Sequence, residues 1–99
     1  MNYENILKSL QSDRFTEVID TGSNFEKGAT IYAKEIRQNV FLLFVVIKRI
    51  RIKNIHVFIA SFDRLESIGI KEPLQTMFYL SITKNEDFHY FKKYIKVSQ

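Results

Sequence analysis

The strongest constraint on the fold is an unbroken apolar run, VFLLFVVI, at residues 40–47. Successive side chains of a β-strand point to opposite faces of the sheet, so this run places apolar side chains on both faces. Its β-branched and aromatic residues show no helical period, which favours a strand over a helix. We therefore predict a central strand, and each of its two faces must be covered.

The apolar run continues into alternating cations and isoleucines, KRIRIK, at residues 48–53. We predict that the strand extends over residues 40–52 and that Lys53–Asn54 forms a two-residue turn, because asparagine tolerates the backbone angles that such turns require. Residues 55–62 then return beside it as the next strand. The pattern predicts a long hairpin with an apolar base and a basic tip.

The register of this hairpin decides which side chains share a face. The turn places Arg51 opposite His56 and Arg49 opposite Phe58, and side chains that lie opposite each other in an antiparallel pair are on the same face. The isoleucines of the tip take the other face. One side of the tip is therefore expected to pack, and the other to present cations around an aromatic ring.

Length and composition place the whole chain, residues 1–99, in a single domain with 45% apolar residues. The absence of cysteine excludes disulfides, thiolate catalysis and cysteine-bound metal. The first residues show no signal-peptide pattern, and the longest apolar run is far shorter than the roughly 18 residues of a membrane span. We expect a soluble, cytoplasmic protein.

Apolar alternation, turn residues and helix caps predict the remaining elements. Strands are expected at residues 15–21, 29–37, 40–52, 55–62 and 74–83, and helices at residues 3–11, at residues 63–68 and from Asn85 onward. Residues 74–83 also fit a helical stripe, but the strand is favoured. The predicted fold class is α+β, an antiparallel meander sheet of about five strands with N- and C-terminal helices packed on one face.

Positive charge is concentrated in the hairpin. The formal charge of the chain is +4, and no acidic residue lies between Ile36 and Phe62. This asymmetry indicates an anionic partner, although a solvated hairpin that resists aggregation has the same composition. The residues predicted to contact a partner or nucleic acid are Arg49, Arg51, Lys53, His56, Phe58, Lys92, Lys93 and Lys96.

The apolar run also gives the sheet more apolar surface than one layer of helices can cover. The side chains left on the second face are Phe41, Leu43, Val45 and Ile47. Phe62, Tyr79 or residues 63–73 could cover them within the chain, or a second copy could do so in a symmetric dimer. The dimer alternative predicts a homodimer whose interface is formed by Phe41, Leu43 and Val45.

No residue pattern supports catalysis, a cofactor or a metal. The glycines are too dispersed for a phosphate-binding loop, and no serine lies in a G-x-S-x-G turn. Glu86 and His89 have the E-x-x-H spacing of di-iron sites, but such sites need two copies of the motif and the chain has one. We predict no catalytic residue, no cofactor and no metal ligand, and we interpret His56 as a contact residue rather than a general base.

These patterns predict a small non-enzymatic regulatory or interaction protein that binds a macromolecular partner, protein or nucleic acid, through its sheet and basic hairpin. The first alternative is a nucleic-acid-binding protein that uses residues 48–58. The second is a small RNase-like toxin with His56 or His89 beside an arginine or lysine. No membrane or small-molecule substrate is indicated, and the size and composition suit an accessory protein of a mobile genetic element.

Overall fold

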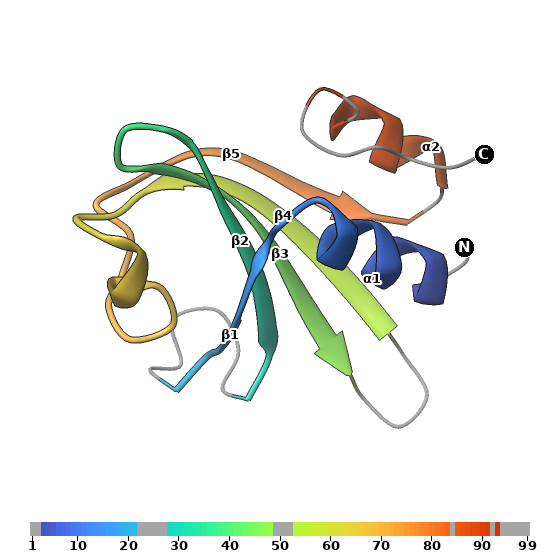
Figure 1. Cartoon of the computed structure of the whole chain (residues 1–99), viewed down its shortest axis with the longest axis horizontal. Helices are drawn as coiled ribbons and strands as arrows, with labels where there is room; N and C mark the ends of the chain where they lie inside the picture. The colour runs from blue at the N-terminus through green and yellow to red at the C-terminus, as the bar shows by residue number, and fades with distance from the viewer. Residues whose placement is uncertain (1–2, 22–27, 49–52, 84, 92, 94–99) are drawn as a thin grey trace.

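The computed structural model describes residues 3–21, 28–48, 53–83, 85–91 and 93 of the chain. Over these residues the protein is a five-stranded antiparallel sheet in the order β1-β2-β3-β4-β5, with a few short helices (Figure 1). The strands are β1 (Thr16–Ile19), β2 (Thr30–Arg37), β3 (Val40–Lys48), β4 (Lys53–Ser61) and β5 (Gln75–Ile82). Each strand pairs with the next one along the chain, so the predicted meander is confirmed, and the fold is mostly β with limited helix.

The helical elements are short. They are the α-helices α1 (Tyr3–Ser12) and α2 (Asn85–Phe88) and the 3-10 turns η1 (Leu65–Ser67) and η2 (His89–Phe91). The predicted helix at residues 63–68 is thus a single 3-10 turn, and the last helix changes to 3-10 geometry at His89. Residues 92 and 94–99, which include Lys92 and Lys96, lie outside the described residues. None of the described helices has the length and apolar content needed to cross a membrane.

The central hairpin has a different register from the predicted one. Lys48 lies opposite Lys53, and Val45 lies opposite His56, so the last described rung of the ladder joins residues 48 and 53. The prediction of a two-residue turn at Lys53–Asn54 is wrong, because both of these residues belong to β4. The observed pairing sets the apolar run of β3 against the apolar residues of β4, and residues 41–46 of β3 are buried with Ile55, Val57 and Ala60 of β4.

Strand β5 confirms the favoured prediction for residues 74–83. It pairs with β4, with Phe58 opposite Tyr79, and a bulge interrupts the ladder between Ile59 and Ala60. Since β5 is the last strand in the order, it forms one edge of the sheet and β1 forms the other.

One face of the sheet carries an aromatic cluster to which the helical elements contribute. The ring of Phe44 stacks on Phe88 at 5.3 Å between centroids and meets the edge of Phe91 at 5.4 Å and of Phe15 at 5.6 Å. Leu10 of α1 is completely buried in the same cluster. We call this set of residues the helix-side cluster; it uses the even-numbered residues of β3.

The second face is covered by residues 62–74, which link β4 to β5 and which we call the β4–β5 connection. Phe62 and Ile68 of this connection pack in one buried cluster with the odd-numbered residues of β3. Phe41, Leu43 and Val45 are 1%, 0% and 1% exposed in the single chain. The cover within the chain, one of the two alternatives that the sequence left open, is therefore the one observed for these three side chains, and they offer no exposed surface for a dimer interface.

Candidate functional site: an aromatic pocket on the second face

The β4–β5 connection does not cover the whole second face, and a hollow remains beyond it. Its volume is about 210 Å³, and it is lined by Val45 and Ile47 of β3, His56 and Phe58 of β4, and Tyr79 of β5. We call it the aromatic pocket. Ile47, His56 and Phe58 are partly exposed, whereas Val45, nearer the connection, is buried. The pocket thus begins where the intramolecular cover ends.

Strand register brings the pocket residues together. Val45 lies opposite His56 in the β3–β4 ladder, and Phe58 lies opposite Tyr79 in the β4–β5 ladder. Opposite residues of an antiparallel pair share a face, with their Cβ atoms about 5 Å apart. Three adjacent strands therefore place these side chains next to one another on the second face, at a position set by the register of the strands.

Three rings form the accessible wall of the pocket. The imidazole of His56 and the ring of Tyr79 are nearly parallel, with an angle of 18° between their planes and 5.7 Å between centroids. The tyrosine hydroxyl and Nδ1 of His56 are 2.6 Å apart and share a hydrogen bond, in which the hydroxyl donates when Nδ1 carries no proton. Phe58 packs against Tyr79 at 5.0 Å between centroids. Tyr79 is 53% exposed, so part of its side chain is accessible from solvent.

The aromatic pocket adjoins the basic segment of the chain. Ile47, which lines the pocket, precedes Lys48, and Lys48 is paired with Lys53 at the last described rung of the β3–β4 ladder. Residues 49–52, with the predicted contact residues Arg49 and Arg51, lie outside the described residues. The arrangement provides aromatic rings, the imidazole nitrogens of His56 and the hydroxyl of Tyr79, and Lys48 is the cationic residue that follows the pocket in the sequence.

The predicted contact residues separate into three groups. His56 and Phe58 meet in the aromatic pocket. The backbone of Lys53 begins β4, and Lys93 is exposed after η2 at the other end of the described chain. The residues outside the described part are Arg49, Arg51, Lys92 and Lys96. The predicted pairing of Arg49 with Phe58 is wrong, because the residue opposite Phe58 is Leu43.

Sequence reasoning did not place Tyr79, Val45 and Ile47 in a binding site. It considered Tyr79 only as a cover for the second face, and Val45 as a dimer contact. Two signals in the sequence point to the pocket. The apolar runs of β3 and β4 pair best when aligned with each other, and the alternation of side chains along β5 places Tyr79 on one definite face of the sheet. Together they place Tyr79 beside Phe58 on the face of Val45.

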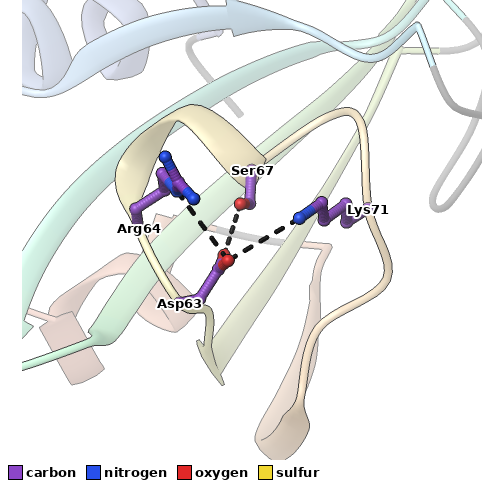
Figure 2. Close-up of polar contacts among 4 residues, drawn as sticks. All are labelled: Asp63, Arg64, Ser67 and Lys71. Atoms are coloured by element: carbon purple, nitrogen blue, oxygen red, sulfur yellow. Dashed lines mark hydrogen bonds and ion pairs between the residues drawn. The ribbon is translucent and has the colours of Figure 1, made fainter.

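A second polar cluster lies in the β4–β5 connection (Figure 2). The hydroxyl of Ser67 donates a hydrogen bond to Asp63, and Nε of Arg64 and Nζ of Lys71 lie 3.8 and 3.7 Å from the same carboxylate. The hydrogen bond from Ser67, assisted by the two cations, holds the pKa of Asp63 below its ordinary value. The carboxylate closes the η1 turn across four residues, so we interpret this cluster as a brace for the connection.

A larger hollow, of about 400 Å³, lies beside this brace. Its wall carries charges of both signs, from Arg14, Lys34, Glu35, Asp63 and Arg64. Lys34 also lies over the ring of Phe15, 5.5 Å from its centroid. The mixed charges give this hollow no evident preference for an anion or a cation, and the aromatic pocket is the better candidate.

The titratable side chain of Tyr32 belongs to the core and not to a pocket. Burial raises the pKa of Tyr32, with a smaller contribution from Glu17, and a hydrogen bond to the side chain of Gln11 partly opposes the shift. A protonated hydroxyl is consistent with the place of Tyr32 in the helix-side cluster. Among the described residues, no three histidine or acidic side chains are grouped as metal ligands.

Comparison of the chain with protein-family models, with curated proteins and with solved structures gives no significant match in any of the three.

Proposed function

We propose that the protein is a non-catalytic binding module whose macromolecular partner is single-stranded nucleic acid. Bases stack on Tyr79 and Phe58 in the aromatic pocket, and the cations of residues 48–53 neutralise phosphates. The observation that carries the proposal is the half-exposed side chain of Tyr79, which packs with His56 and Phe58 on one face of the sheet.

The chemistry of single-strand binding matches this arrangement. Proteins that bind single strands combine aromatic side chains, on which bases stack, with a basic groove that follows the backbone. Stacking on one aromatic ring contributes about 1–3 kcal/mol per base. A pocket of about 210 Å³ on an open sheet face admits one flat ring system, and the polar atoms of His56 and Tyr79 can hydrogen-bond to its edge.

The RNase-like alternative finds less support in the placement of the histidines. His56 lines the pocket with Val45, on the second face. His89 is in η2, whose Phe91 packs on Phe44 in the helix-side cluster. The two imidazoles therefore lie on opposite faces of the sheet and cannot act as an acid–base pair, so an RNase would depend on a single histidine beside an arginine or lysine.

The test is the binding of a labelled single-stranded oligonucleotide by wild-type protein and by Tyr79→Ala. Loss of one stacked base weakens binding by roughly 5- to 150-fold, the equivalent of about 1–3 kcal/mol. The matched control is Tyr90→Ala, because Tyr90 is 76% exposed in η2, outside the pocket, and its loss leaves the affinity unchanged. The charge reversals Arg49→Glu and Arg51→Glu, made together, abolish binding, and the wild-type affinity falls with salt at a log-log slope of about −0.7 per phosphate neutralised.

Three outcomes contradict the proposal. If Tyr79→Ala and Tyr90→Ala bind equally well, the pocket is not the site. If wild-type protein binds no single-stranded DNA or RNA at low salt, the partner is a protein. If the wild-type protein cleaves RNA and His56→Ala does not, the protein is an RNase and not a binding module.

A further inference from the structure

Strand β5 presents an apolar edge that no described element covers. Figure 1 shows β5 at the outer edge of the sheet, paired on one side with β4. Its first five residues are all exposed. Four of the seven exposed large apolar side chains of the described residues lie in this strand or next to it: Leu74, Met77, Phe78 and Tyr79, at 72%, 48%, 41% and 53% exposure.

The two edges of the sheet differ in how they are protected. β1 is four residues long and includes Glu17, and short, charged edges are the usual protection against pairing with another chain. β5 has eight residues, QTMFYLSI, with no charge and no proline. A bulge at Met77 interrupts the inner ladder, and the regular stretch after it, Phe78 to Ile82, is long, neutral and apolar enough to accept a further strand.

We propose that the occupant of this edge is the β5 strand of a second copy, paired antiparallel about a twofold axis perpendicular to the sheet. Such an axis keeps equivalent faces on the same side, so a continuous sheet of two chains carries both helix-side clusters on one face and both aromatic pockets on the other. Tyr79 lies near the middle of β5, so the partner's β5 lies beside the pocket and bounds its open side.

Self-pairing is favoured by the charge and the area of the edge. A neutral strand opposite its own copy brings no like charges together, whereas a charged partner strand would gain no complementary contact from β5. An aromatic side chain can bury about 150–250 Å², so Phe78 and Tyr79, each about half exposed, offer on the order of 200 Å² per chain, and Leu74 and Met77 add to it. Two chains then bury more than about 400 Å² of side chain, and the strand backbones add to this towards the roughly 1,200 Å² of a stable dimer.

This inference does not depend on the proposed ligand, and its test contains no nucleic acid. Sedimentation of the wild-type protein across a range of concentrations gives a reversible monomer–dimer equilibrium. Met77→Lys places a charge in the edge and raises the concentration at the monomer–dimer midpoint at least tenfold. The matched control is Ile19→Lys, because Ile19 on the other edge is 50% exposed and Met77 is 48% exposed, and this variant dimerises like wild type.

Hydrogen exchange locates the interface independently of the variants. Backbone amides on the outer side of β5 become protected as the wild-type protein concentration rises through the dimerisation midpoint, and those of β1 do not. A wild-type protein that stays monomeric throughout overturns the proposal and leaves the edge to a strand of another protein. A dimer that survives Met77→Lys, or one whose concentration-dependent protection lies outside β5, also overturns it.

Discussion

The two faces of the sheet are completed in different ways. The helix-side cluster closes one face with rings from both ends of the chain, and Phe44 at its centre is completely buried. The second face is closed by the β4–β5 connection over Phe41, Leu43 and Val45, and it stays open at His56 and Tyr79. The first face is therefore a core, and the second is part core and part open surface. A single strand, β3, supplies buried side chains to both.

The largest expected effect compares Phe44 with Phe58, one ring from each face. Phe44→Ala removes a fully buried ring with three aromatic neighbours, and we expect it to lower the free energy of unfolding by about 3–5 kcal/mol. Phe58→Ala removes a partly exposed ring at the pocket and is expected to cost less than half as much. Urea denaturation of both variants measures the difference, and equal costs would mean that the open part of the second face is packed like the core.

The next effect concerns the attachment of the β4–β5 connection. Gly69 has φ +84°, and a Cβ there would lie 3.0 Å from the carbonyl oxygen of Ile19 and 3.1 Å from Cγ1 of Val18. Gly69→Ala is expected to cost about 1–3 kcal/mol from backbone strain alone, with the close contact added to it. Gly28→Ala is the control, because φ is +85° and nothing lies within 4 Å of its Cβ position. If both variants lose the same stability in thermal unfolding, the connection is not held tightly against β1.

A smaller effect is expected inside the pocket. Tyr79→Phe keeps the ring that packs on Phe58 and removes the hydroxyl that bonds to His56. A hydrogen bond contributes about 0.5–1.5 kcal/mol, and this one is exposed, so we expect a loss of stability at the lower end of that range. A large loss in urea denaturation would show that the hydroxyl is part of the core and not of a binding surface.

The smallest effect is a pH dependence of the brace in the connection. The pKa of Asp63 is below its ordinary value of 3.8 in the folded protein, so its contribution to stability is complete above that value and is lost as the pH falls towards the lowered pKa. Ser67→Ala removes the main cause of the shift. The variant should therefore lose less stability than wild type between about pH 5 and pH 3, as measured by denaturation at each pH. Parallel losses in the two proteins would exclude Ser67 as the cause.

The sequence predicted the positions of the strands along the chain more accurately than the register between neighbouring strands. The run in β3 identified a strand with two buried faces, and alternation in β5 was enough to favour a strand. The hairpin register was wrong because the pattern KRIRIK alternates like a strand, and local alternation does not show where a ladder ends. Pairing energy decides this: the observed register sets Val46 against Ile55 and Phe44 against Val57.

The candidate site was predictable only in part for the same reason. His56 and Phe58 were singled out by their residue types, which are local information. Tyr79 joins them through the β4–β5 ladder, and the extent of the cover over Phe41 depends on how a connection folds back, which no periodicity encodes. Side chains that meet across several strands require the tertiary structure.

The attachment at Gly69 has a consequence for how the domain unfolds. In a meander each strand pairs only with its sequence neighbours, so an end strand could detach without disturbing the others. Here the carbonyl of Gly69 accepts a hydrogen bond of 2.9 Å from the backbone amide of Thr21, just after β1, although Gly69 lies between β4 and β5. This hydrogen bond ties the end of β1 to the β4–β5 connection, so β1 cannot detach until the connection moves away from it. Local opening of β1 is therefore linked to global unfolding.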